Sequence, residues 1–199
     1  MPPARRPSDT RNVYSFEGTL VPPDQLVLET SFVVDALIPS QARHAECEGF
    51  LENIGRARSK VFVNRFLELE LWEAAYRIAL REHHPKKRPR DARSSGAVLR
   101  RAKTLREEAD AAWHDALSVL ERVVVDLAEV QERVPSLMRH GLTSYDAVHA
   151  AAAEYVDVRP FVTLDYHFAA VPENQLQLWV PASRLRPCRE RRKPKTGCD

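Results

Sequence analysis

The sequence predicts an α/β fold with a largely parallel sheet, and two observations lead to this prediction. Short apolar runs recur along the chain, and segments with the three- and four-residue spacing of amphipathic helices separate them. Strands that alternate with helices are typical of parallel sheets, because each parallel connection needs a crossover. The chain has 199 residues, of which 44% are hydrophobic, and is long enough for one domain with a full core. The expected strands are 26–28, 61–63, 123–125, 161–164 and 176–180.

Five segments have the spacing of helices. The most regular is the stretch from Val98 to Leu120, where apolar residues return every three or four positions. Later in the chain, Gly141 is expected to close one helix, and Thr143 or Ser144 is expected to open the next. The expected helices are 42–54, 66–83, 98–120, 128–139 and 144–156.

The expected folded domain covers residues 26–182. Five prolines interrupt residues 1–25, which show no sustained apolar spacing, so we expect an irregular N-terminal extension there. Residues 183–199 are rich in Pro and Arg and have too little apolar surface to fold alone, so we expect a disordered basic tail. Two prolines also interrupt the second helical pattern, which predicts a basic loop at about residues 84–97.

The net charge of +2 hides an uneven distribution of charge along the chain. Residues 1–12, 81–106 and 184–199 together hold 20 of the 30 Lys and Arg residues but only 5 of the 28 acidic residues. The protein is therefore expected to have an acidic body with basic arms. Such a body either concentrates carboxylates around cations or presents solvated acidic helix faces, and basic arms suit a polyanion such as RNA.

The sequence predicts a soluble cytoplasmic protein. No stretch approaches the roughly 20 uncharged apolar residues of a membrane span. The basic start of the chain lacks the apolar run of a signal peptide. Cys47, Cys188 and Cys198 are an odd number of cysteines without metal-ligand spacing, so we expect free thiols in a reducing compartment.

Acidic residues follow several of the expected strands at the point where each strand ends. Glu29 and Asp165 come directly after two apolar runs, and Glu70 lies one or two helical turns beyond a third. Asp146 lies in the first turn of a helix. Because the carboxyl ends of neighbouring parallel strands line the crevice where α/β proteins bind ligands, these four acids are expected to converge. A magnesium or manganese ion relieves repulsion among carboxylates and activates water for attack on a phosphodiester.

Each of these acids also has a structural interpretation. Asp146 lies three residues after Thr143, which is the spacing of a capping box. Glu70 belongs to an acidic helix segment that is typical of a solvated surface, and Asp165 is placed like a turn or cap residue. Asp126 also follows a strand, and we interpret it as structural because a helix pattern begins directly after it.

Four motifs in order resemble the PIN-domain nucleases and, within them, the VapC-like toxins of bacterial toxin–antitoxin pairs. The first two are LVLETSFVVDAL, with its acid-Thr-Ser turn, and VFVNRFLELELWEA, in which the spacing from Asn64 matches the family's acid to Glu70. The third and most specific is GLTSYDAVHAAAA, and the fourth is VTLDYHF. The resemblance spans about residues 26–180.

The resemblance implies a three-layer α/β/α fold and a metal-dependent endoribonuclease that uses Mg²⁺ or Mn²⁺. In that pattern Glu29 and Asp146 are the most direct metal ligands, and Glu70 and Asp165 complete the cluster through the ion or its waters. Ser31 and Thr163 fall on the family's supporting polar positions. The expected partners are an RNA substrate, a cognate antitoxin protein and a second copy of the chain in a homodimer.

One residue departs from the family pattern, because position 29 is Glu where the family normally has Asp. The extra methylene moves the carboxylate farther into the site, and catalytic groups tolerate displacements of only about 0.5 Å. This departure leaves a second hypothesis open, in which the protein is a catalytically impaired PIN-like protein that binds RNA or another protein.

His149 lies one helical turn after Asp146. A histidine among alanines in a helix is more often a packed residue than a catalytic one, and we interpret it in that way.

The basic loop is longer than a compact nuclease requires. Its cations are expected to contact RNA phosphates or an acidic segment of the antitoxin, and a merely solubilising loop is the alternative. The candidate RNA-binding residues are Lys86, Lys87, Arg88 and Arg90.

Overall fold

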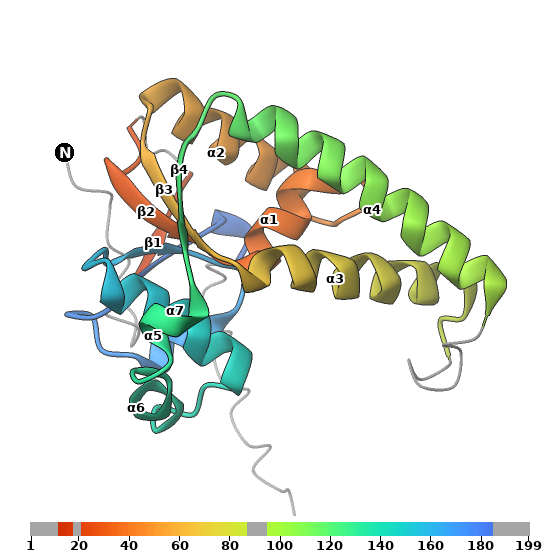
Figure 1. The fold of residues 1–199 in the computed structure, drawn as a ribbon. Coiled ribbons are helices and arrows are strands. Elements are labelled where there is room, and N and C mark those ends of the chain that lie inside the picture. Colours follow the sequence, from red (N-terminus) through yellow and green to blue (C-terminus); the bar gives the residue numbers. More distant parts are fainter. Residues whose placement is uncertain (1–11, 18–20, 87–94, 185–199) are drawn as a thin grey trace, which may run out of the picture.

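Six strands form the central sheet of the computed structural model (Figure 1), which describes residues 12–17, 21–86 and 95–184. Their order across the sheet is β1-β6-β5-β2-β3-β4, and every neighbouring pair is parallel. The sheet confirms the predicted α/β class. The strands are β1 (Val13–Ser15), β2 (Gln25–Leu28), β3 (Lys60–Asn64), β4 (Glu121–Val125), β5 (Pro160–Val162) and β6 (Gln177–Val180).

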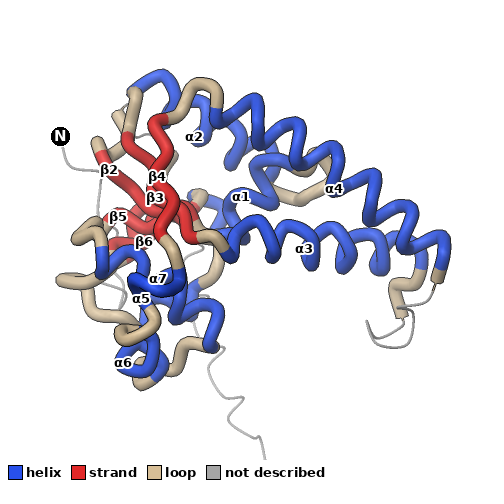
Figure 2. The backbone as a smooth tube through the Cα atoms, in the orientation of Figure 1, coloured by secondary structure: helices blue, strands red, loops and turns tan. Residues whose placement is uncertain are grey.

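Helices cover both faces of the sheet and complete the expected three-layer arrangement (Figures 1 and 2). One core lies on the side of α1 to α4 and contains Phe32 and Trp113, and the other lies on the side of α5 to α7 and contains Leu137 and Ala151. The helices are α1 (Thr30–Leu37), α2 (His44–Ala57), α3 (Phe66–His83), α4 (Gly96–Leu117), α5 (Leu127–Val130), α6 (Val134–Met138) and α7 (Ser144–Tyr155), with the 3-10 helices η2 (Tyr166–Ala170) and η3 (Ala182–Arg184).

The helices α3 and α4 form a long hairpin that projects away from the sheet (Figures 1 and 2). Their facing sides bury apolar residues at helical spacing, and a pair of contacts from Arg101 to Glu82 (2.8 and 3.3 Å) joins them near the far end. The expected basic loop, at about residues 84–97, falls between these helices, although α4 already begins at Gly96. Lys86 is described and exposed, whereas Lys87, Arg88 and Arg90 lie outside the described residues.

The prediction of an irregular extension over residues 1–25 missed β1. Val13, Tyr14 and Ser15 pair with β6 at the edge of the sheet, and the ring of Tyr14 stacks on Trp179 at 5.8 Å. Phe16 continues into the core and stacks on Phe50 at 4.3 Å. The strand escaped detection because its apolar run is only two residues long, Val13 and Tyr14, and because its partner lies far away in the sequence.

The expected helix over residues 128–139 is two short helices, α5 and α6. Pro135 lies in the first turn of α6, and a continuous helix would bring its ring against the carbonyl group of Gln131. Gly141 closes this region with a φ of +88°, which is left-handed backbone that favours glycine. The expected tail 183–199 lies outside the described residues from position 185 onward.

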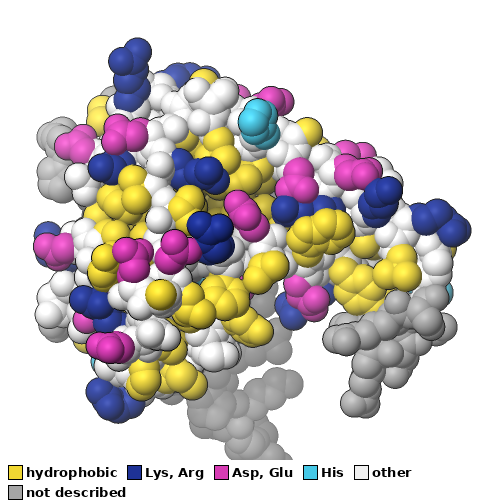
Figure 3. All heavy atoms as spheres, viewed as in Figure 1, with side chains coloured by type: hydrophobic (Ala, Val, Ile, Leu, Met, Phe, Trp, Pro, Cys, Tyr) yellow, Lys and Arg dark blue, Asp and Glu magenta, His cyan; other side chains and the backbone are white. Residues whose placement is uncertain are grey.

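Hydrophobic side chains are exposed over the α3–α4 hairpin and beside the start of α3 (Figure 3). Large exposed side chains of the hairpin include Leu69, Leu99 and Trp72, which is 52% exposed. In the part of the chain that the structure describes, no helix combines the length and the apolar character that a membrane span requires.

Candidate active site

The order of the strands brings several predicted site residues to one edge of the sheet. The strand β2 lies between β5 and β3, and all three are parallel, so their carboxyl ends meet at this edge. Glu29 follows β2 and caps α1, and Thr163 and Asp165 follow β5. Glu70 lies on α3, which begins just after β3, and Asp146 lies in the first turn of α7.

Glu29 is buried, with an exposed fraction of 6%, and hydroxyl and amide donors hold both of its oxygens. The backbone N–H of Ser31 donates to Oε1 at 3.0 Å, and the Thr163 hydroxyl donates to Oε2 at 2.8 Å. The Ser31 hydroxyl also donates to Oε2, and it accepts from the backbone N–H of Leu164 at 2.9 Å. Ser31 and Thr163 therefore both hold the Glu29 carboxylate through hydrogen bonds.

Burial raises the pKa of Glu29 above its ordinary value, and the neighbouring His149, Ser31 and Thr163 only partly offset this. A positive charge next to Glu29 would therefore stabilise its ionised form.

Glu70 belongs to a chain of hydrogen bonds that reaches into the core. Its Oε2 lies 2.6 Å from Nε2 of His149 and also accepts from the Thr30 hydroxyl. On the other side of the ring, Nδ1 of His149 lies 2.5 Å from Nδ2 of Asn64. The Oδ1 atom of Asn64 accepts from the backbone N–H of Phe66, so the amide directs its N–H group at Nδ1 and the neutral ring carries its hydrogen on Nε2.

The expectation that His149 is a packed residue is confirmed by its exposed fraction of 1%, but the residue also holds Glu70. Burial opposes a positive charge on His149, whereas the hydrogen bond that its ring donates to Glu70 and the charges of Glu29, Glu70 and Asp146 favour it, and on balance its pKa is raised. For Glu70, burial raises the pKa. Contacts with His149, Thr30 and Arg77 outweigh burial, so the pKa of Glu70 is lowered. Sequence reasoning missed this arrangement. A polar residue within the alanine run of α7 was the available signal.

Asp146 forms the capping box that the sequence left open as its structural interpretation. The Thr143 hydroxyl donates to Oδ2 of Asp146 at 2.6 Å, and the backbone N–H of Thr143 lies 3.4 Å from the same oxygen. Asp146 is half-buried, and its charge acts on His149 one turn later. Both hydrogen bonds of its carboxylate that involve described residues go to Oδ2, and Oδ1 is not needed for the cap.

Asp165 caps the 3-10 helix η2, which was also its structural interpretation. The backbone N–H of His167 donates to Oδ1 at 2.9 Å, and the Asp165 side chain remains 39% exposed. The backbone N–H of Asp165 donates to the Thr163 hydroxyl oxygen at 2.9 Å. Thr163 therefore connects Asp165 to Glu29.

A cleft of about 1270 Å³ lies over this edge of the sheet. Glu29, Glu70 and Asp165 line it together, and Tyr145 lines it beside Asp146, which is not itself a lining residue. The structure thus brings three of the four predicted acids to one cleft. Several other residues line the cleft and were not predicted from the sequence, because only the tertiary structure brings their elements together. These residues are Arg43, Arg77, Arg81, Arg184 and Tyr166.

The donor atoms of the cleft fit a hard divalent cation in kind, because carboxylate oxygens are the ligands that magnesium and manganese prefer. However, too few of these side chains lie close enough together to hold such an ion. Within residues 12–17, 21–86 and 95–184, no group of three or more His, Cys, Asp or Glu side chains is placed to hold a metal ion. The expected cluster of four converged carboxylates is therefore not formed, because each acid is turned toward its own hydrogen-bond donors.

A comparison with protein families agrees with this geometry. The model of the PIN domain family matches residues 26–174, which is more than half of the chain and includes all four predicted acids. A search of curated proteins found no match. The all-parallel sheet, the acids at its carboxyl edge and the extent of the family match lead to one conclusion: the chain belongs to the PIN-domain family.

Proposed function

We propose that the protein is a metal-dependent endoribonuclease and the toxin of a toxin–antitoxin pair. PIN domains are typically metal-dependent nucleases, which are hydrolases of phosphodiester bonds. The observation that carries the proposal is that Glu29, Glu70 and Asp165 come from three separate segments and line one cleft. RNA as the substrate, Mg²⁺ or Mn²⁺ as the ion and an antitoxin as the partner are the finer parts of the proposal.

In this proposal Glu29 and Asp146 hold the cation most directly, and Glu70 and Asp165 complete its surroundings. The bound ion supplies an activated water and offsets negative charge that develops on the phosphodiester. Ser31 and Thr163 orient Glu29 through the hydrogen bonds already present. His149 holds Glu70, and Thr163 links the segment of Asp165 to Glu29.

The raised pKa of Glu29 supports a cation site, because a buried carboxylate is costly to ionise and His149 offsets only part of that cost. A divalent ion beside Glu29 removes that cost. Glu29 also bears on the competing hypothesis of an impaired protein that only binds. Its side chain is longer than that of the usual Asp, and its carboxylate is directed at Ser31 and Thr163.

The direct test is cleavage of a mixed RNA pool by the purified protein with Mn²⁺. We expect cleavage that stops when a chelator removes the metal and returns when Mn²⁺ is added back. A Glu29→Asp variant is assayed beside the parent protein. Cleavage by that variant alone would show an impaired nuclease, and the absence of cleavage by both proteins would overturn the nuclease proposal.

The toxin role has a separate test. We expect expression of the protein in bacteria to arrest growth, because uncontrolled RNA cleavage stops protein synthesis, and we expect co-expression of the product of the neighbouring gene to relieve the arrest. Growth rate after induction is the measurement. Unimpaired growth of cells that contain active enzyme would contradict the toxin role while leaving the nuclease activity intact.

We also propose a homodimer, as the resemblance to the family implies, and a cytoplasmic location, as the composition of the sequence predicts. Leu69 and Trp72, which lie one turn apart on α3, and Leu99 on α4 are exposed and support the dimer, because exposed apolar patches are typical of protein interfaces. Light scattering at several protein concentrations measures the mass, and a monomer throughout would contradict the homodimer.

A further inference from the structure

The cleft has a second end with the opposite charge. Beyond the acids, its walls carry Arg43 from the start of α2, Arg81 from the last turn of α3 and Arg184 from η3. We propose that these three arginines, here called the arginine end, bind the phosphates of a single-stranded nucleic acid next to the bond that is cut. The inference rests on the proposed nuclease function and assigns the residues that place its substrate.

The helix α3 connects the two ends of the cleft. Glu70, Arg77 and Arg81 all line it, and Arg77 and Arg81 are four residues apart, which places them on one face of the helix. From Glu70 to Arg81 the helix rises by about 16 Å at its usual rise per residue. A strand whose scissile phosphate lies at Glu70 therefore has neighbouring phosphates within reach of Arg81.

The arginine end has an excess of positive charge. Burial raises the pKa of the Asp35 carboxyl, and Arg43, Arg184 and Arg81 all act to lower it, so all three arginines lie near enough to influence one half-buried acid. Among the described residues, no carboxylate lies within ion-pair distance of any of these three arginines. In addition, Nε of Arg43 is buried without a hydrogen-bond acceptor in the described structure. Such donors are typical of a site that awaits an anion.

Local contacts hold the arginine end in place. The Tyr166 hydroxyl donates to the backbone carbonyl of Arg184 at 2.8 Å, and the Ser183 hydroxyl donates to Glu46 of α2 at 2.8 Å. The segment that carries Arg184 is thus fixed to two walls of the cleft.

A phosphate fits these groups better than a peptide carboxylate does, because of where the arginine end lies in the cleft. Arginine pairs with either anion through two parallel N–H donors, so its chemistry alone does not choose between them. The arginine end, however, continues the cleft that holds the carboxylates of the proposed nuclease site, and a strand bound there must present successive phosphates along α3. A protein segment with acidic side chains need not present its charges along α3. Binding of such a segment in place of RNA would contradict the inference.

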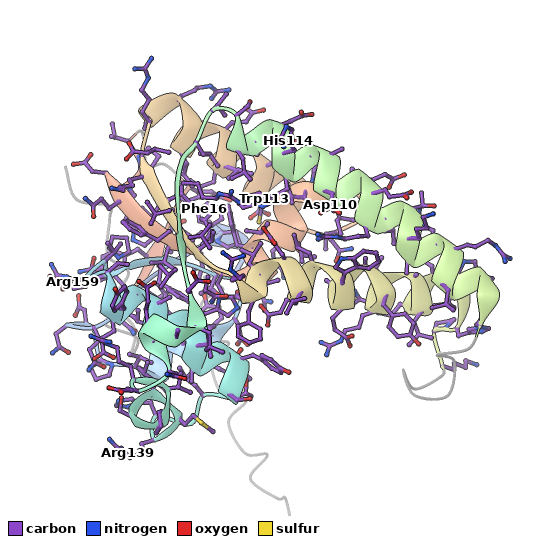
Figure 4. The ribbon with its side chains drawn as sticks, in the orientation of Figure 1. Phe16, Asp110, Trp113, His114, Arg139 and Arg159 are labelled. Carbon is purple, nitrogen blue, oxygen red and sulfur yellow. The ribbon has the colours of Figure 1, made fainter. Side chains whose placement is uncertain are left out.

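The test measures binding of a fluorescein-labelled single-stranded RNA of about 12 nucleotides, within the usual range of site sizes. Fluorescence anisotropy is recorded with a chelator present, so that the RNA is not cut, at several KCl concentrations. The variant is Arg81→Gln with Arg184→Gln. The matched control is Arg139→Gln with Arg159→Gln, which removes the same charge from two exposed arginines that do not line the cleft and lie away from the α3–α4 hairpin (Figure 4).

We expect the cleft variant to bind RNA roughly 10-fold more weakly at low salt, because charge-assisted hydrogen bonds are lost. The slope of log K against log [salt] should fall by about 1 to 2, as fewer phosphates are contacted. The control should keep the affinity and slope of the parent protein. Equal losses in the two double variants would overturn the inference, as would unchanged binding by the cleft variant or no binding by the parent protein.

Two further measurements distinguish this inference from an acidic-protein site and from the nuclease proposal on which it rests. A poly-glutamate peptide that binds through Arg81 and Arg184, while RNA binding is unaffected by their loss, would assign the arginine end to an acidic protein instead. RNA cleavage with Mn²⁺ is measured on the same samples. If the parent protein binds RNA through the arginine end but does not cut it, the nuclease proposal is wrong and the binding site stands. If the parent protein cuts RNA and the cleft variant binds it as tightly, the nuclease proposal stands and the binding site is wrong.

Discussion

RNA cleavage by the Asp146→Asn variant is expected to be at least about 100-fold slower than cleavage by the parent protein, since even indirect partners of a metal site contribute up to that factor. Asp146 is one of the two proposed direct ligands, and the substitution removes its charge while keeping its shape. The remaining side-chain oxygen still accepts from Thr143, so α7 keeps its cap. Initial rates at saturating Mn²⁺ and at limiting Mn²⁺ measure the effect.

The matched control is Asp126→Asn. Asp126 also ends a strand and caps a helix, and it is exposed and paired with Arg65 at 2.7 Å. It does not line the cleft, so its variant should cleave RNA at the rate of the parent protein. Equal rates for the parent protein and Asp146→Asn would rule out a catalytic role for Asp146. A loss of the same size in Asp126→Asn would trace the effect to folding instead.

The second large effect is on stability, where we expect His149→Ala to lower the free energy of unfolding by about 3 kcal/mol. The substitution leaves a cavity at a fully buried position. It also leaves the buried amide of Asn64 without its partner, and it removes the hydrogen bond to Glu70. Glu70 adds less to this loss than a fully buried acid would, because 27% of its side chain is exposed and water can replace part of the contact. Urea unfolding is the measurement.

His114→Ala supplies the control for that experiment. His114 lies on the exposed side of α4 (Figure 4), so its loss should change the free energy of unfolding by less than about 0.5 kcal/mol. A His149→Gln variant can still donate to Glu70 and should recover part of the stability. If His149→Ala loses under about 1 kcal/mol, the ring is not held by the network that links Asn64 to Glu70.

The sequence predicted those parts of the fold that depend on local spacing. Apolar runs at 26–28 and 61–63 became central strands, because burial leaves a regular pattern. For the same reason the spacing from Val98 onward became α4, which ends at Leu117 instead of the expected residue 120. The capping box of Thr143 and Asp146 was readable for the same reason, since its partners are three residues apart.

The same logic explains what sequence reasoning missed. The strand β1 gains its hydrogen bonds from β6, and the contacts of His149 join Asn64 and Glu70 from elements about 80 residues away in sequence. No local pattern encodes such pairs. The mixed charge along α3 did not indicate that Arg81 would line one cleft with Arg43 and Arg184.

By itself, then, the sequence determined the class of fold, five of its strands, its longer helices and the acids placed at strand ends, because the periods of strands and helices and the chemistry of caps act over a few residues. It did not predict β1 or α1. Only the tertiary structure decided where Glu29 and Glu70 point. Donors on other elements orient them, such as Thr163 for Glu29 and His149 for Glu70, whereas Asp146 and Asp165 turn toward local caps. A carboxylate turns toward whichever donors surround it once burial removes water, and those donors are brought together by folding.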